Sequence, residues 1–352
     1  MTARGTGSEW LRSSGRGAPG VRHDPVLEVT DLTTQFDTLD GMVHAVNGVS
    51  FTLNRGEFLG VVGESGSGKS VTMMSILRLI PMPPGEIVSG QAMYENFDLI
   101  DIDIDELRDI RGSKIGFIFQ DPMTSLNPVL TVGFQIEESL KVHQQIGADD
   151  RQARALELLD LVGIPSPEQR LTSYPHELSG GMRQRVMIAI ALACSPQILI
   201  ADEPTTALDV TIQAQIIELV KDLREKFGTA VIWITHDLGV VAGLADRVAV
   251  MYGGRIVEES PVAELYASPQ HPYTKGLLGS IPRLDQKGSD LETIQGQPPS
   301  LYNMPESCSF APRCAHAFDR CHEEIPPLAQ ISPNHRVACF WDLENDRPRD
   351  DI

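Results

Sequence analysis

The stretch Gly63-Glu64-Ser65-Gly66-Ser67-Gly68-Lys69-Ser70 decides the fold of this chain. It follows an apolar run at residues 59–62 and precedes a helical run at residues 71–79, so it joins an expected buried strand to an expected helix. Glycines let consecutive backbone N–H groups turn inward around phosphate oxygens, at a helix N-terminus whose dipole favours anions. The pattern G-x-x-x-x-G-K-[ST] in this context predicts a nucleotide-phosphate loop.

Two side chains of this loop have specific expected tasks. Lys69 is expected to reach the β- and γ-phosphates of ATP, and Ser70 to be a ligand of Mg²⁺, which prefers oxygen donors. A Gly-rich turn that matches by accident is the alternative, and the flanking strand and helix argue against it. The other residues expected to bind ATP in this part of the chain are Gly63, Ser65, Gly66, Gly68 and Thr72.

Composition restricts the class of protein. The 352 residues, 41% of them apolar, suffice for one large globular domain and an appendage. The 48 acidic and 29 basic side chains give a net charge of −19, which disfavours a nucleic-acid surface because phosphates are bound by Lys and Arg. No segment approaches the roughly 18 apolar residues that span a bilayer, so we expect any membrane role to come through partner proteins.

The chain divides into regions of different composition. Residues 25–270 alternate short β-branched runs with helical periods, which predicts an α/β domain, and residues 121–178 are expected to form a helical insertion in it. Residues 271–345, rich in Pro and Cys, are expected to form a small loop-rich appendage. Residues 1–24 are expected to be a disordered extension and residues 346–352 a flexible tail. Further buried strands are expected at residues 115–119, 198–201, 230–234 and 248–251.

An acidic pair follows one of these strands. Asp202 and Glu203 end the apolar run at residues 198–201, and carboxylates at the C-terminal end of a parallel strand point into the ligand crevice. We expect Asp202 to hold Mg²⁺ and Glu203 to polarise the attacking water as a general base. A solvated acidic turn is the alternative interpretation of this short motif.

Leu178-Ser179-Gly180-Gly181-Met182, continued by Arg183-Gln184-Arg185, resembles the signature motif of the ABC ATPase family. Physically it is a second anion-binding helix start, in which Ser179 supplies a hydroxyl and Gly180 and Gly181 allow close backbone approach. The resemblance implies a P-loop ABC ATPase with a RecA-like core, an antiparallel β subdomain and a helical subdomain. It also implies a head-to-tail dimer, in which the signature contacts the γ-phosphate of ATP held by the opposite subunit.

Further matches to the family follow in order. Gln120 resembles the glutamine that senses Mg²⁺ and the attacking water, and His236 resembles the switch histidine that hydrogen-bonds the γ-phosphate. Ala207-Leu208-Asp209 resembles the loop that communicates across the dimer, with Asp209 expected at the ATP site. Phe36 stands where the family carries an aromatic that stacks on adenine, although a Phe near a strand is often a core residue. The expected catalytic residues are Gln120, Glu203 and His236.

Four phrases resemble one branch of the family, the ATPase subunits of oligopeptide, dipeptide and nickel importers. They are QDPMTSLNP at residues 120–128, YPHE at 174–177, HPYTKGLL at 271–278 and GQPPSL at 296–301. The resemblance implies a peripheral protein at the cytoplasmic face of the cell membrane that powers import of di- or oligopeptides. The implied partners are a second ATPase subunit (a related chain or a second copy), two transmembrane permeases and an extracytoplasmic solute-binding protein, with no nucleic acid.

Other ABC proteins fit the sequence less well. Soluble ABC ATPases of DNA repair usually interrupt the domain with a long coiled coil or a zinc insertion, and none lies between Gln120 and Ser179. Translation-associated members carry two ATPase domains in one chain, whereas this chain has one phosphate loop. Exporter subunits often have a fused membrane domain or lack a Cys-rich tail.

The cysteines of the tail suggest a metal site. Cys308, Cys314, Cys321 and Cys339 gather in the last fifth of the chain, whereas Cys194 stands alone in an apolar run. In a reducing compartment four clustered thiols indicate metal binding before disulfides, and four thiolates suit an iron–sulfur cluster or zinc. The resemblance to the importer tail favours a [4Fe–4S] cluster, with zinc or free thiols as alternatives.

Overall fold

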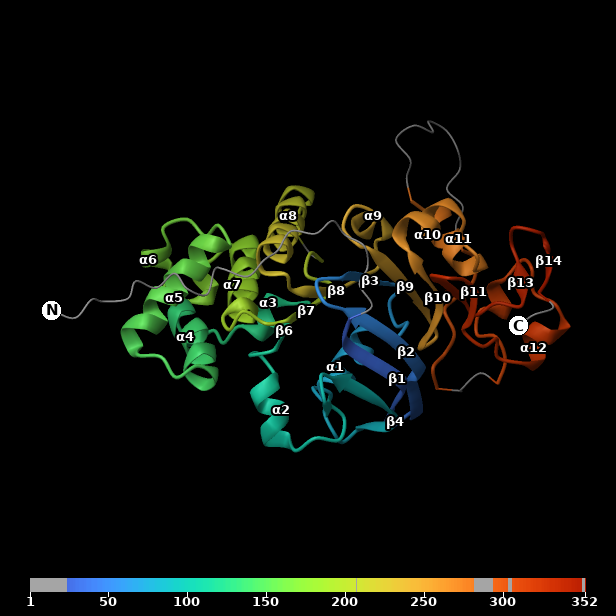
Figure 1. The fold of residues 1–352 in the computed structure, drawn as a ribbon, viewed down its shortest axis with the longest axis horizontal. Coiled ribbons are helices and arrows are strands. Elements are labelled where there is room, and N and C mark those ends of the chain that lie inside the picture. The colour runs from blue at the N-terminus through green and yellow to red at the C-terminus, as the bar shows by residue number, and fades with distance from the viewer. Residues whose placement is uncertain (1–23, 207, 282–293, 303–305, 350–351) are drawn as a thin grey trace.

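A computed structural model of the protein describes residues 24–206, 208–281, 294–302, 306–349 and 352. The expected disordered extension at residues 1–24 lies outside these ranges except for its last residue, and residues 350–351 of the expected tail lie outside them too. Within the described residues, two mixed layers of strands and helices meet at the phosphate loop, with the C-terminal strands at one end of the molecule (Figure 1).

The larger sheet forms the centre of the molecule. From one edge to the other its strands in the described residues are β11 (Ala329–Ser332), β12 (His335–Val337), β10 (Arg255–Pro261), β9 (Arg247–Tyr252), β3 (Phe58–Val62), β8 (Ala230–Thr235), β7 (Ile198–Asp202) and β6 (Ile115–Ile118). The stretch from β9 to β6 is parallel, and β9, β10, β12 and β11 pair antiparallel. The five strands expected from the sequence in this region are confirmed. Strands β3, β7 and β8 are buried throughout, as near-continuous apolar runs in parallel sheets are.

The smaller sheet is antiparallel and confirms the expected β subdomain. Its order is β2 (Gly41–Asn54), β1 (Pro25–Thr38), β4 (Gly85–Tyr94) and β5 (Phe97–Asp98). The alternating burial along β1 and β2 turns one face of this sheet toward a core that it shares with helix α1 (Lys69–Ile76). The phosphate loop therefore lies where the two sheets meet.

Helices form the rest of the regular secondary structure in the described residues, apart from a short C-terminal hairpin. The expected helical insertion contains α3 (Pro122–Ser125), α4 (Val132–His143), α5 (Ala148–Leu161), α6 (Pro167–Arg170) and a 3₁₀ turn at Pro175–Glu177, which confirms its helical character. Figure 1 places α4–α6 at the end of the molecule opposite the C-terminal strands. The others are α2 (Ile104–Ile110), α7 (Gly180–Leu192), α8 (Val210–Phe227), α9 (Leu238–Val241), α10 (Val262–Ala267), α11 (Pro272–Gly279) and α12 (Asp319–Glu323).

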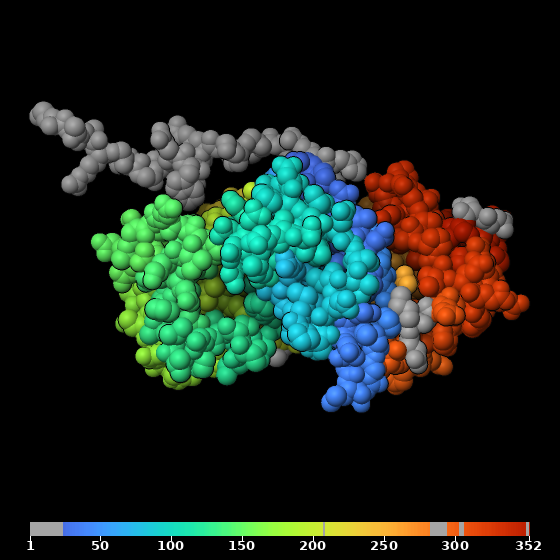
Figure 2. Space-filling view, turned by 90° about the horizontal axis from the view of Figure 1, so that it is seen from below, coloured from blue at the N-terminus to red at the C-terminus, as the bar shows by residue number. Residues whose placement is uncertain are grey.

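The C-terminal segment, residues 294–302 and 306–349, is less separate than its composition indicates. Strands β11 and β12 extend the central sheet, because β12 hydrogen-bonds to β10. A 3₁₀ turn at Ala311–Arg313 and a short hairpin of β13 (Trp341–Asp342) and β14 (Arg347–Pro348) complete it. Figure 2 shows this segment, in red, beside the blue N-terminal strands, and the Arg336 guanidinium donates to the Ser50 carbonyl oxygen of β2 at 3.3 Å. A domain boundary near residue 271 remains a prediction.

Candidate functional site

The phosphate loop between β3 and α1 needs its glycines for steric reasons. Gly63 and Gly68 have φ angles of +156° and +98°. A Cβ atom on Gly63 would lie 2.2 Å from the Met251 carbonyl oxygen, and one on Gly68 would lie 2.5 Å from the Ala45 carbonyl oxygen. The loop thus packs directly on the backbone of neighbouring strands, and a side chain at either position would push it out of place.

Lys69 is buried at the bottom of this loop. The residue is only 4% exposed, and its Nζ donates to the carbonyl oxygens of Gly63 at 2.8 Å and Glu64 at 2.9 Å. Burial lowers the pKa of Lys69, and the nearby carboxylates of Glu203 and Asp202 partly offset this by raising it. A buried cation held by neutral carbonyl oxygens is electrostatically suited to an anionic ligand.

Ser70 and Asp202 bring two oxygen donors together. Ser70 lies in the first turn of α1, and Asp202 is the last residue of β7. The Ser70 hydroxyl donates to Asp202 Oδ1 at a distance of 2.7 Å. Burial raises the pKa of Asp202, and the hydrogen bond from Ser70 opposes that shift. A hydroxyl and a carboxylate side by side are the hard oxygen donors that Mg²⁺ takes, so these residues fit the ion expected here.

Glu203, which follows β7, is contacted by residues that follow two other strands and by one residue of its own loop. Its Oε2 lies 3.3 Å from Gln120 Nε2 and 3.3 Å from His236 Nδ1, which follow β6 and β8. Thr206 donates its hydroxyl to the same oxygen at 2.9 Å. Glu203 has a φ of +44°, a strained conformation for a residue with a Cβ, and such strain concentrates at functional sites. The carboxylate is thereby held in one place beside the loop.

Lys69, Ser70 and Glu203 line one open cavity of about 700 Å³, whereas Asp202 is not in its lining. The structure brings together the phosphate-loop residues from 64 to 70 with Gln120, Glu203 and His236 in its lining. Leu277 and Ser280, from the end of α11, complete the wall. Sequence reasoning missed both as site residues, although the HPYTKGLL phrase that contains Leu277 marked the segment.

Three residues from the N-terminal part of the chain that are predicted to bind ATP do not line this cavity. Thr72 is fully buried, and its hydroxyl donates to the Gly68 carbonyl oxygen at 2.8 Å inside α1. Phe36 is half-buried on β1 and packs against the core of the smaller sheet, where a Cβ on Gly85 would come within 3.0 Å of its ring. Gly63 is not in the lining either, but its carbonyl oxygen holds Lys69.

The signature residues lie on another surface. Ser179 caps α7, accepting from the Met182 N–H at 3.4 Å, and Asp209 caps α8, accepting from the Ile212 N–H at 3.0 Å. Both capping residues and Gly180 are exposed and outside the cavity. A Cβ on Gly181 would lie 2.9 Å from the Ile212 side chain, so the two helix starts are packed together. Within one chain they do not reach the phosphate loop.

The prediction of a metal site in the tail is wrong. Among the described residues, which include all four tail cysteines, no group of three or more His, Cys, Asp or Glu side chains is arranged to hold a metal ion. Cys321 is buried in a small apolar cluster with Phe340 and Ala311, and Cys339, which precedes Phe340 in the chain, is buried as well. Burial raises the pKa of Cys308 to about 11 and that of Cys339 to about 12, so both side chains are neutral thiols in this structure. The [4Fe–4S] cluster and the zinc ion expected for the tail are therefore not supported by the arrangement of these cysteines.

Comparisons with known proteins agree with the site. Residues 46–206 match the family model "ABC transporter", and residues 257–321 match "Oligopeptide/dipeptide transporter, C-terminal region". The oligopeptide transport ATP-binding protein OppD of Bacillus subtilis (strain 168) is 54% identical over 94% of this chain and 92% of its own length. The dipeptide transport ATP-binding protein DppD of the same organism is 52% identical over 90% of this chain and 95% of its own.

A solved structure supports the fold. The dimeric structure of a post-hydrolysis state of the ATP-binding cassette MJ0796 bound to ADP and Pi has a TM-score of 0.61 at 33% identity, covering 67% of this chain and 98% of that chain. The described fold and site define an ABC-type ATPase. The chain belongs to the family of ABC transporter ATP-binding subunits, in the branch that carries the oligopeptide/dipeptide transporter C-terminal region.

Proposed function

We propose that this chain is the ATP-hydrolysing subunit that powers import of di- or oligopeptides through an ABC transporter. The observation that carries the proposal is the continuous likeness to peptide-transport subunits, which includes the C-terminal region as well as the ATPase core. The alternative, a soluble ABC ATPase of DNA repair or translation, has no support in that region.

The residues of the site divide the chemistry among them. Bound MgATP would supply the phosphoryl group that is transferred to water and the negative charge of the phosphates that the site binds. Lys69 and the loop amides bind the terminal phosphates, and Ser70, Asp202 and Gln120 are the oxygen donors offered to Mg²⁺. Glu203 takes a proton from the attacking water as general base. Gln120 Nε2 and His236 Nδ1 each lie 3.3 Å from Glu203 Oε2 and hold the carboxylate in place. In this proposal Gln120 also polarises the attacking water, and His236 polarises the γ-phosphate.

Dimerisation completes the site in this proposal. Ser179, Gly180 and Gly181 present a helix N-terminus that has no anion to bind within its own chain, because it lies outside the cavity. A head-to-tail partner, related or identical, would place this start of α7 and Asp209 over the other subunit's nucleotide. ATP would then hold the two subunits together, and hydrolysis would release them.

Membrane permeases are the proposed partners of the helical segment. In the described residues, no helix has the length and apolar character to cross a bilayer. Four large apolar side chains are exposed between residue 119 and the first turn of α4, a kind of surface that marks protein contacts. They are Phe119, Met123, Val129 and Phe134. We place the chain at the cytoplasmic face of the membrane, with two permeases docked on this surface and a solute-binding protein outside.

The test is affinity purification of the full chain from mildly solubilised native membranes, followed by mass spectrometry. We expect two permeases and a second ATPase subunit, and a peptide bound to the accompanying solute-binding protein. The double variant Met123→Asp/Val129→Asp should lose the permeases, whereas Leu39→Asp, on the exposed β1–β2 turn, should retain them. Recovery of ribosomal proteins or nucleic acid in place of permeases would refute transport and leave the ATPase assignment standing.

A further inference from the structure

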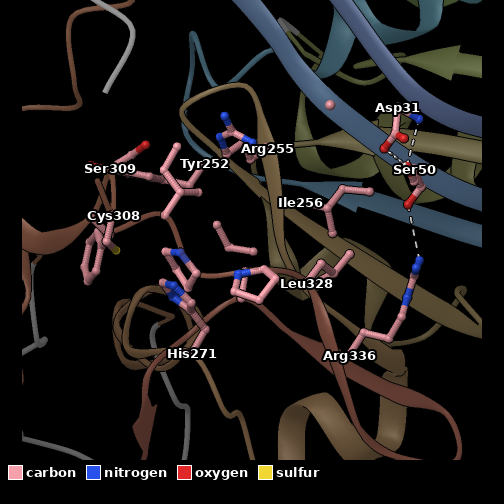
Figure 3. Close-up of a pocket in the computed structure, with 17 residues that line it drawn as sticks. Asp31, Ser50, Tyr252, Arg255, Ile256, His271, Cys308, Ser309, Leu328 and Arg336 are labelled. Carbon is pink, nitrogen blue, oxygen red and sulfur yellow. Dashed lines mark hydrogen bonds between the residues drawn. The ribbon is translucent and has the colours of Figure 1, made fainter. Parts of the chain in front are cut away.

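A second cavity, of about 320 Å³, lies between the N-terminal strands, the start of β10 and the C-terminal segment (Figure 3). No residue of the phosphate loop lines it. Its walls are largely apolar, as in pockets for small molecules, whose volumes are typically about 300–1,000 Å³. The apolar lining includes Ile256, Val257, Phe310, Ile325 and Leu328.

Arg255 brings a charge to this lining without a counter-charge. Its side chain is half-buried, and in the described part of the chain its guanidinium has neither a hydrogen-bond acceptor nor an ion-pair partner. Burial lowers its pKa, and no nearby carboxylate offsets that effect. Such a charge is costly to bury, so the site favours an anion that would pair with it.

The other charged residues of the lining are already engaged. Arg336 donates to a Glu259 carboxylate oxygen and to the Ser50 carbonyl oxygen. Asp31 Oδ1 accepts from the Ser50 hydroxyl at 3.1 Å, and Figure 3 shows this group away from Arg255. Among the cations of the described lining, Arg255 is therefore the one without a hydrogen-bond acceptor or an ion-pair partner.

His271 provides a second donor to the pocket. The residue is 1% exposed, and its Nδ1 accepts from the Tyr273 N–H at 3.0 Å. Burial lowers its pKa to about 4, so the ring is neutral and carries its proton on Nε2. In the described residues that Nε2–H has no acceptor, and Figure 3 places the ring on the wall opposite Arg255.

We propose that this pocket binds a small organic monoanion, a carboxylate with a short apolar body. Arg255 pairs with the carboxylate, His271 donates to an oxygen of the ligand, and the apolar wall covers the remainder. A single cation without a partner matches one negative charge, and the Asp31 carboxylate in the same lining disfavours a dianion such as phosphate. The site is distinct from the ATP cavity in its lining and in the ligand that it selects.

The test is isothermal titration calorimetry of the full chain with butanoate, hexanoate, octanoate and 3-phenylpropionate, each paired with its primary amide. The two members of a pair share shape and differ in charge. We expect at least one carboxylate to bind about tenfold or more tightly than its amide, the gain of a charge-assisted hydrogen bond. Absence of binding by all four carboxylates, or equal binding of acid and amide, would overturn the proposal without reference to any variant.

Variants locate the binding. Arg255→Met should remove the preference for carboxylate over amide, whereas Arg255→Lys should keep part of it. Arg108→Met is the matched control, because Arg108 lies in an exposed ion pair with Asp105 on α2. Arg255→Met removes a charge without a partner, so its thermal unfolding should match that of wild type or improve on it. Full retention of carboxylate preference in a folded Arg255→Met protein would place the ligand elsewhere and refute this pocket.

Discussion

The phosphate loop and the C-terminal segment are neighbours that are stabilised in different ways. The loop is held mostly by its own backbone, since Gly63 and Gly68 have positive φ angles and carbonyl oxygens of the loop hold Lys69. The C-terminal segment joins the central sheet through β12 and is also held by side chains from other parts of the chain. These include an aromatic cluster of Tyr252, Tyr273 and Phe310, whose ring centroids lie 4.6–5.4 Å apart. A backbone-built loop tolerates few residue types, whereas a segment held by side chains depends on distant partners.

The two regions meet at Glu64. Arg313 of the C-terminal segment donates to both carboxylate oxygens of Glu64, at 2.7 and 3.0 Å, and the Glu64 N–H donates to the Tyr273 hydroxyl at 2.8 Å. The hydrogen bond to Glu64 raises the pKa of Arg313, whose side chain is 5% exposed. The second residue of the phosphate loop is therefore fixed by the C-terminal half of the chain. The loop's own residues therefore determine its conformation, whereas contacts from the C-terminal half of the chain help to determine its position.

The largest expected effect separates chemistry from this shared architecture. Glu203→Gln should retain ATP binding and lower turnover by about 10²–10⁴-fold, because the amide cannot accept the proton of the attacking water. Glu225→Gln, on the exposed face of α8, is the matched control. ATPase rate and nucleotide affinity are measured on the same preparations. Turnover near the wild-type rate would remove Glu203 from the role of base.

Sequence reasoning succeeded where chemistry and backbone geometry are local. The loop, the acidic pair after β7 and the strand ends of Gln120 and His236 follow from motifs at fixed spacing, and the structure brings loop residues 64–70, Gln120, Glu203 and His236 to one cavity. The ATP contact of Thr72 stays a prediction, because its hydroxyl donates to the Gly68 carbonyl oxygen and it does not line the cavity. Sequence reasoning failed for the tail, where four cysteines indicated a metal but burial among apolar side chains favours neutral thiols.

Tertiary pairing explains what the sequence left open. Strands β11 and β12 are short and lack a strong alternating pattern, so their addition to the central sheet depends on pairing with β10. The link from Arg313 to Glu64 spans 249 residues and has no signature in sequence spacing. The loop motif predicts Glu64 only as one of its unspecified positions, and nothing in the motif indicates its partner.

The second effect tests the link between the two regions. Arg313→Met should lower the free energy of unfolding by about 2 kcal/mol, because it leaves the partly buried Glu64 carboxylate without its bidentate partner. It should also raise the KM for ATP, since Glu64 loses its side-chain contact with the C-terminal segment and keeps its backbone hydrogen bond to Tyr273. Denaturant unfolding and ATPase kinetics measure the two effects.

A double-mutant cycle makes this second test specific. Adding Glu64→Gln to Arg313→Met should cost less than the sum of the single changes, with an interaction energy of about 0.5–3 kcal/mol. The exposed pair of Arg108 and Asp105 provides the control, and Arg108→Met should cost less than about 1 kcal/mol and leave the KM unchanged. Additive single and double changes would show that the loop and the C-terminal segment are energetically independent.

The smallest effect distinguishes the position of the loop from the stability of the fold. Tyr273→Phe keeps the aromatic cluster and removes only the hydroxyl that accepts from the Glu64 N–H, so the cost should be about 1–3 kcal/mol, that of one unsatisfied backbone donor. Tyr266→Phe is the matched control, because its hydroxyl donates to the Leu238 carbonyl oxygen and it does not line the ATP cavity. If the C-terminal half positions the loop, hydrogen exchange at the Glu64 amide should accelerate in Tyr273→Phe alone. Equal acceleration in both variants would mean that the loop responds to global stability, and the contact at Glu64 would then be packing without a positioning role.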